Sequence, residues 1–210
     1  MTFIDIHTHN GATDTSAAIF NSPNYIEERR ISLGIHPWEI EEGWQERFRA
    51  IEEVAGNSNV VAIGECGIDH LKSAVSIEVQ KEVLHAHALL AARVKKPLIL
   101  HCVKGIDEIV AMHRSFADGQ PWIIHGFRGK PQQAMQLTKV GFYISLGENF
   151  NKETARDIPA DRLFIESDES RLPIEEIYRR VAEARNISTG ELAMQITANA
   201  SIFRAILLHK

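Results

Sequence analysis

Short apolar runs recur along the chain, and a stretch with helical spacing of apolar and polar residues follows most of them. Such runs, bounded by turn-forming residues, are typical of buried strands, and the longer periodic stretches are typical of helices. The runs predict strands over Phe3 to His7, Ala17 to Phe20, Ile31 to Ile35, Val60 to Glu65, Leu98 to His101, Trp122 to His125, Phe142 to Leu146 and Leu163 to Ser167. The periodic stretches predict helices over Gly43 to Ala55, Val75 to Val94, Ile106 to Phe116, Pro131 to Val140, Pro173 to Ala184 and Thr189 to Leu208.

Strands that alternate with helices are typical of a mainly parallel sheet, and eight such units predict a closed (β/α)8 barrel. Barrels of this type usually need about 250 residues, and the chain has 210. Only Thr8 to Ser16 separate the first two predicted strands, which is too short for a crossover helix. We therefore expect an α/β fold, a reduced TIM-type (β/α)8 barrel with a missing or shortened first helix.

Composition narrows the class of protein. A chain of 210 residues with 44% hydrophobic content is expected to form one domain over residues 1–210. Lys and Arg are scattered and the net charge is -5, so the sequence has no cluster of basic residues that would indicate a nucleic-acid-binding surface. Bound divalent cations would still allow a phosphate substrate. Two cysteines, no leader-like segment and no long apolar run favour a cytoplasmic protein with no membrane association and no obligate protein partner.

The first strand runs into His7-Thr8-His9. Side chains two residues apart on a strand point to the same face, so one divalent ion can be reached by both imidazoles. Alone, this pattern also fits two unrelated surface histidines. The rest of the chain decides between the two interpretations.

Other histidines and carboxylates stand at the ends of predicted strands, namely Glu65, His101, His125 and Asp168. In a parallel barrel these carboxyl ends converge on one mouth, where active sites of this architecture lie. Carboxylates gathered there would repel one another without cations. His7, His9, Glu65, His101, His125 and Asp168 together exceed the ligands that one catalytic ion takes, so we expect one or two divalent ions.

The same residues lie in motifs that resemble the TatD family of metal-dependent hydrolases, among the amidohydrolase-like barrels. The motifs span nearly the whole chain: Ile4 to His9, Gly34 to Pro37, Ala62 to Asp69, Leu100 to Cys102, His125 to Gly129, Gly141 to Ser145 and Ile165 to Asp168. The resemblance implies a divalent metal site made by the six residues above, and hydrolysis, often of DNA phosphodiesters. It further implies that Glu65 bridges two ions, that His7, His9 and Asp168 hold one, and that His101 and His125 hold the other.

The chain departs from the family pattern in its substrate-facing loops. Family members commonly carry an Arg two residues after the histidine at 101, where this chain has Val103 followed by Lys104. They also have a long loop after the final Asp, whereas a helix is predicted soon after Asp168. Lys104, Arg128 and Arg171 are candidate phosphate contacts, although ordinary surface charges fit these positions at least as well.

Further residues have open roles. His36, at the end of its strand, is a candidate substrate contact or a structural histidine. Glu166 lies one pleat below Asp168 and is a candidate partner that orients a histidine. His87 is expected on a helix surface, and Trp38 is expected to pack in the core or a loop.

We therefore predict a divalent-metal-dependent hydrolase, a TatD-like deoxyribonuclease or phosphodiesterase whose substrate is single-stranded DNA or a small phosphoester. The ions would activate a water, Glu65 and Asp168 would be the catalytic residues, and Asp168 would take or shuttle its proton. An amidohydrolase acting on an amide or lactone and a non-catalytic metal-binding protein are the alternatives. The His and carboxylate ligands do not distinguish Zn, Mn, Mg, Ni and Fe.

Overall fold

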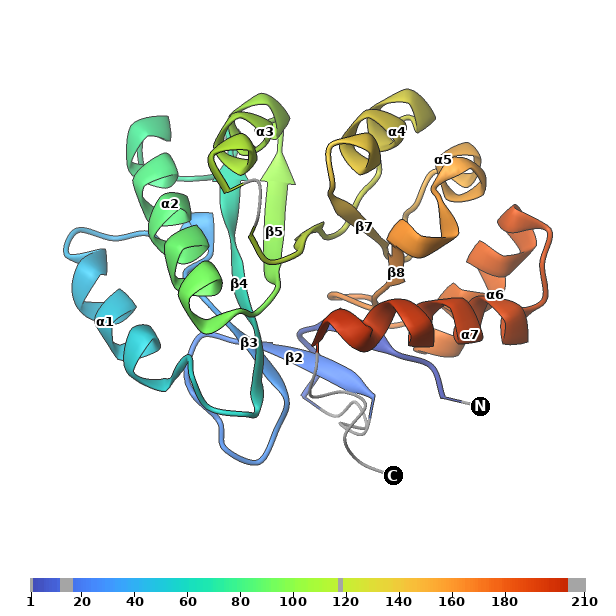
Figure 1. Ribbon diagram of the computed structural model, residues 1–210, viewed down its shortest axis with the longest axis horizontal. Coiled ribbons are helices and arrows are strands. Elements are labelled where there is room, and N and C mark those ends of the chain that lie inside the picture. Colours follow the sequence, from blue (N-terminus) through green and yellow to red (C-terminus); the bar gives the residue numbers. More distant parts are fainter. Residues whose placement is uncertain (1, 12–16, 117–118, 204–210) are drawn as a thin grey trace. The chain divides into compact units, whose positions relative to one another are not determined.

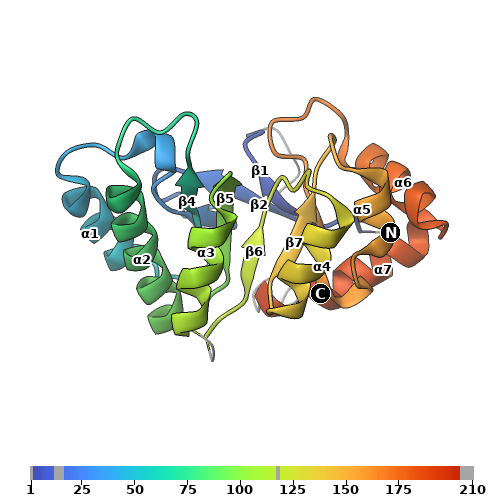
Figure 2. The ribbon, with the colours of Figure 1, turned by 90° about the horizontal axis from the view of Figure 1, so that it is seen from above.

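The computed structural model describes residues 2–11, 17–116 and 119–203. Its chain divides into two compact units, which we call the N/C unit (Met1–Phe20 and Ile123–Lys210) and the middle unit (Asn21–Trp122). Figures 1 and 2 show the elements of both units. All strand pairs described within them are parallel, which agrees with the alternation of strands and helices in the sequence.

The middle unit contains a parallel sheet in the order β3–β4–β5. Its elements are β3 (Ile31–Leu33), a 3-10 helix η1 (Pro37–Glu39), α1 (Trp44–Val54), β4 (Val60–Asp69), α2 (Ile77–Val94), β5 (Leu98–Val103), α3 (Ile106–His113) and η2 (Arg114–Phe116). Every residue of β4 is buried, as expected of a parallel strand covered on both faces. Helix α2 lies alongside β4 and β5 (Figure 1).

In the N/C unit the first and last strands of the chain are neighbours. β1 (Asp5–Thr8) pairs with the beginning of β2 (Ala18–Ser22), and a parallel bridge joins Thr8 to Asp168, just past β8 (Leu163–Ile165). β6 (Trp122–Ile124) and β7 (Tyr143–Leu146) continue the sheet beyond β8. The strand order in this unit is therefore β6–β7–β8–β1–β2.

Helices of the N/C unit pack against one another and against this sheet. They are α4 (Pro131–Lys139), α5 (Lys152–Asp157), η3 (Ala160–Arg162), α6 (Ile174–Arg185), α7 (Thr189–Asn199) and η4 (Ala200–Phe203). α6 and α7 lie side by side (Figure 2). The buried Tyr178 hydroxyl of α6 donates to the Ile4 carbonyl at 2.7 Å, which ties this helix to the chain entering β1. A capping box formed by Ser188 and Glu191 begins α7.

Most predicted elements match the structure, and the differences lie at their ends. β4 runs on to Asp69 and β5 to Val103, so the prediction that Glu65 and His101 end their strands is wrong. The short helix α5 was not predicted, because six residues are too few to show helical periodicity. The final helix ends as α7 at Asn199, followed by η4, and the predicted end at Leu208 lies outside the described residues.

The first crossover was expected to be too short for a helix, and the second is short as well. The described residues between β1 and β2, 9–11 and 17, contain no helix, and the rest of that segment lies outside the described part of the chain. Between β2 and β3, residues 23–30 are all described and form turns and bends. The first helix of the chain is thus α1, which follows β3.

His87 is buried in α2, contrary to the expected surface position. Its exposed fraction is 0%. Its Nδ1 lies 2.8 Å from the Val83 carbonyl and its Nε2 accepts the Ile35 N–H at 3.0 Å. The ring is therefore neutral with its proton on Nδ1, and it fixes the backbone just after β3. Burial lowers the pKa of His87 to about 4.

We predict that burial of His87 makes the folded chain less stable as the pH falls. The unfolded chain binds a proton at this residue near pH 6.5 and the folded chain only near pH 4, so stability falls as the pH falls through this window, by up to about 3 kcal/mol. His87→Gln should be less stable at pH 7 and lose stability less steeply between pH 6.5 and 4. Urea unfolding at several pH values measures both effects. The exposed His85→Gln is the control, and an unchanged slope in His87→Gln would contradict the assignment.

Candidate metal centre

Each unit contains a group of candidate metal ligands among its described residues. His7, His125 and Asp168 form the group of the N/C unit, and His36, Glu65 and His101 form the group of the middle unit. In each group three ligand atoms lie within 4.8 Å of one another. All six residues predicted as ligands therefore lie in or beside one of the groups, since His9 contacts Asp168.

In the N/C unit, the bridge between β1 and the end of β8 positions His7, His9 and Asp168. The Asp168 N–H donates to the His7 carbonyl at 2.9 Å, and the His9 N–H donates to the Asp168 carbonyl at 3.1 Å. Nε2 of His7 and Nε2 of His9 lie 3.8 and 3.6 Å from Asp168 Oδ1. The side chains of both histidines thus point to one carboxylate, as the two-residue spacing predicts.

Asp5 holds this bridge in place from within β1. Its carboxylate accepts the Ser167 N–H at 3.0 Å, the Ser167 hydroxyl at 2.6 Å and the His7 N–H at 3.3 Å. The Ser167 hydroxyl also lies 2.8 Å from Thr8 Oγ1. Asp5 and Ser167 were not predicted as site residues, because both lie inside the motifs where strand residues are expected to be structural.

Glu166 orients His125. Its Oε1 lies 3.2 Å from His125 Nδ1 and accepts the Gly126 N–H at 2.6 Å. Burial raises the pKa of Glu166, but attraction to His125 and His7 when these rings are protonated, with hydrogen bonds from His125 and Ser145, holds the pKa below its ordinary value. Since Oε1 already accepts the Gly126 N–H, it also accepts from His125 Nδ1, and Nε2 is then the nitrogen of His125 that suits an ion.

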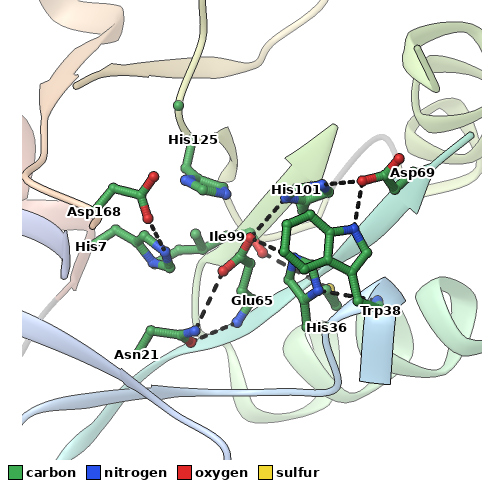
Figure 3. Close-up of polar contacts among 12 residues, drawn as sticks. His7, Asn21, His36, Trp38, Glu65, Asp69, Ile99, His101, His125 and Asp168 are labelled. Carbon is green, nitrogen blue, oxygen red and sulfur yellow. Dashed lines mark hydrogen bonds and ion pairs between the residues drawn. The ribbon is translucent and has the colours of Figure 1, made fainter. Parts of the chain in front are cut away.

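In the middle unit, Asp69 has the same role toward His101 (Figure 3). Its Oδ2 lies 3.0 Å from His101 Nε2 and accepts the Trp38 indole N–H at 2.6 Å, while Oδ1 accepts the N–H groups of Leu71 and Lys72. Burial opposes ionisation, but these hydrogen bonds lower the pKa of Asp69 to about 2. His101 therefore carries its proton on Nε2.

The remaining nitrogen of His101 lies against Glu65. His101 Nδ1 and Glu65 Oε1 are 3.0 Å apart, and in the tautomer that Asp69 selects both atoms have lone pairs. Two such atoms at this distance need a cation or a proton between them, so the pair fits a divalent ion. Glu65 is itself held by Asn21, whose Oδ1 accepts the Glu65 N–H at 3.0 Å and whose Nδ2 lies 3.4 Å from Glu65 Oε2.

His36 differs from the other imidazoles. Its Nδ1 accepts the Trp38 N–H at 3.1 Å, so its proton lies on Nε2, which is 3.1 Å from Glu65 Oε1. An imidazole in this state donates a hydrogen bond and has no lone pair free for an ion. His36 thus fits a hydrogen-bond donor to Glu65, and its role as a substrate contact stays a prediction.

Two other candidate substrate contacts, Arg128 and Lys104, have different surroundings. Arg128 and Asp168 line one cavity of about 190 Å³ in the N/C unit, together with Asn149 and the hydrogen-bonded pair of Ser170 and Glu148. Lys104 is exposed just after β5, and its φ of 57° places it in the left-handed region. The structure thus brings Arg128 into a cavity with a candidate ligand.

Asn21 and Asp69 were missed in the sequence. Asn21 directly follows the predicted second strand, so the rule that strand ends carry site residues would have found it. Asp69 lies four residues beyond the predicted end of its strand, and only the true length of β4 shows that it faces His101.

The chain belongs to the TatD related DNase family, which matches residues 3–203. A metal-dependent hydrolase of Bacillus subtilis, YabD, is 29% identical over 82% of this chain and 76% of its own length. A protein of Edwardsiella piscicida named 3'-5' ssDNA/RNA exonuclease TatD is 27% identical over 86% of this chain and 73% of its own. The crystal structure of YJJV, a TatD homologue of Escherichia coli, has a TM-score of 0.79 and 21% identity over 96% of this chain and 97% of its own.

These likenesses confirm two predictions. The fold is the α/β barrel of TIM type, and the chain is a TatD family metal-dependent hydrolase. Among the described residues, no helix combines the length and apolar character that a bilayer span requires.

We predict that Glu166→Gln weakens metal binding about 10- to 100-fold, because an amide can donate as well as accept and no longer selects the His125 tautomer with its proton on Nδ1. Titration of the chelator-treated protein with Mn²⁺ or Zn²⁺ in a calorimeter measures the affinity. The exposed Glu153→Gln on α5 is the matched control. Equal affinities of both variants would show that Glu166 does not orient a ligand.

We further predict that Gly67→Ala disrupts the middle group. A Cβ at Gly67, where φ is 148°, would lie 2.0 Å from the His101 carbonyl oxygen, so β4 and β5 would have to separate between Glu65 and His101. The expected loss is at least about 2 kcal/mol of unfolding free energy, with weaker metal binding. Gly56→Ala, where a Cβ meets nothing within 4 Å, is the control for both measurements. A Gly67→Ala protein as stable as this control would refute the close approach.

Proposed function

We propose that the chain hydrolyses phosphodiester bonds of single-stranded nucleic acid with one or two divalent ions. The observation that carries the proposal is the group of candidate ligands in each unit, in which a buried carboxylate selects the tautomer of one histidine, Asp69 for His101 and Glu166 for His125. Histidines that bind metal ions commonly have such a carboxylate partner. The relatives named as exonucleases and the family match over residues 3–203 support this substrate, and residues 1–210 as one hydrolase domain.

His7, His9, His125 and Asp168 would hold an ion in the N/C unit, and Glu65 with His101 would hold one in the middle unit. Such an ion, when bound, lowers the pKa of a water toward neutrality and stabilises the charge on the phosphoryl oxygens. The ligand types fit Zn, Mn, Mg, Ni or Fe. In this proposal Asp168, in the N/C unit, accepts the proton of the attacking water. Glu65, in the middle unit, is the second catalytic residue and acts as a ligand of the ion there.

Arg128 and His36 supply the substrate contacts in this proposal. Arg128 lines the cavity that contains Asp168, and a guanidinium suits a phosphate because it can donate two parallel hydrogen bonds. The Nε2–H of His36 is a donor for a phosphoryl or leaving-group oxygen. The cytoplasm is the proposed compartment, since neither cysteine forms a disulfide.

The experiment that tests the proposal measures release of nucleotides from a labelled single-stranded oligonucleotide. Activity should disappear after chelator treatment and return with Mn²⁺ or Zn²⁺. Turnover of amides or lactones with no hydrolysis of nucleic acid would select an amidohydrolase, and metal binding without any turnover would select a non-catalytic protein.

Asp168→Asn should lower kcat at least about 100-fold, because an amide cannot accept the proton. The fold should survive, since the two backbone hydrogen bonds of Asp168 remain and Asn tolerates its φ of 53°. The exposed Asp161→Asn is the control. If Asp168→Asn binds metal and keeps the activity of this control, the carboxylate is not the proton acceptor.

A further inference from the structure

A large aromatic side chain lies half exposed beside the middle group. The exposed fraction of Trp38, on η1, is 45%, so of the two expected positions the core is excluded and packing in the connection after β3 remains. Its ring centroid lies 4.6 Å from that of His36 and 5.5 Å from that of His101 (Figure 3). An indole is thus in contact with two histidines of the group while much of its surface faces solvent.

The indole is held rigidly. Its N–H donates to the ionised Asp69 at 2.6 Å, and the backbone N–H of Trp38 donates to His36 at 3.1 Å. Asp69 is in turn fixed by backbone amides and by Gln80, whose Oε1 accepts the Asp69 N–H at 2.8 Å. Since the ring already has one orientation, a ligand that stacks on it immobilises no additional side chain.

The Trp38 ring is also in contact with a cation. The ammonium of Lys72 lies 4.3 Å from the Trp38 ring centroid, and the Lys72 side chain is exposed. A cation–π contact at an exposed site is weaker than the stacking of a nucleobase on an aromatic ring. A base can therefore take the place of the ammonium, and the flexible lysine stem lets that ammonium reach the phosphate attached to the same nucleotide.

We propose that Trp38 and Lys72 form a nucleotide subsite, in which the terminal base of a single-stranded substrate stacks on the indole and Lys72 binds its phosphate. The inference rests on the proposed phosphodiesterase function and names how that site recognises its substrate. Stacking on an aromatic ring accepts every base, so the subsite predicts a preference for an unpaired terminal nucleotide with little preference for its sequence. Trp38 is a specificity-determining residue in this account.

The test compares binding of dAMP and 2-deoxyribose 5-phosphate, which differ only in the base, to the full chain with Mn²⁺. Wild type should bind dAMP about tenfold more tightly than the sugar phosphate. Trp38→Ala should remove this preference and Trp38→Phe should keep most of it. Lys72→Met should weaken both ligands equally and leave their ratio unchanged. Leu89→Ala, an exposed apolar residue on α2, is the control and should match wild type.

A second measurement does not depend on the stability of Trp38→Ala. Added dAMP should quench part of the wild-type tryptophan fluorescence, and this quenching should be absent from Trp38→Phe, which retains Trp44 and Trp122. The subsite is refuted if wild type does not prefer dAMP, or if Trp38→Ala keeps the preference. Oligonucleotide hydrolysis by wild type is measured in the same preparation. If wild type hydrolyses the oligonucleotide but does not prefer dAMP, only the subsite is overturned. If wild type prefers dAMP but does not hydrolyse the oligonucleotide, only the proposed phosphodiesterase activity is overturned.

Discussion

A histidine binds a metal ion only through a ring nitrogen that carries no proton, so the partner of its other nitrogen decides whether it is a ligand. Asp69 holds the proton of His101 on Nε2, and Glu166 holds that of His125 on Nδ1. Both carboxylates are buried and would be costly without partners. The backbone and side-chain hydrogen bonds that keep them ionised are therefore the condition on which the chemistry of the candidate ligands depends.

The backbone meets this condition through close contacts between strands. In the middle unit Gly67 lets β4 approach the His101 carbonyl, which sets the separation of Glu65 and His101. In the N/C unit Asp5 and Ser167 join β1 to the end of β8, which brings His7 and His9 toward Asp168. Buried strands form the scaffold in both units, and the polar residues near their ends carry the chemistry, as in other parallel α/β proteins.

His36 and His101 show that residue type alone does not decide whether a histidine fits a metal ligand. Both are histidines at or near the end of a strand, and both contact Glu65. His101 is held by a carboxylate and keeps a lone pair, whereas His36 is held by a backbone N–H and keeps a proton. The same side chain therefore fits a ligand in one position and a hydrogen-bond donor in the other. Trp38 shows a related effect, since its hydrogen bond to Asp69 holds a large apolar ring at the surface.

The order of strands and helices and the α/β class followed from the sequence, because burial on both faces produces apolar runs. The candidate ligands were predicted from polar residues in the second half of these runs or just after them and from the family motifs, although Glu65 and His101 lie inside longer strands than the pattern indicated. The hydrophobic pattern did not show that β4 extends to Asp69, that His87 is buried, or that α5 exists, because these features depend on neighbours distant in sequence. Tertiary structure alone decided the protonation of each imidazole and the place of Trp38. A proton is held by whichever group lies within hydrogen-bonding distance, and folding sets that distance between residues such as Asp69 and His101.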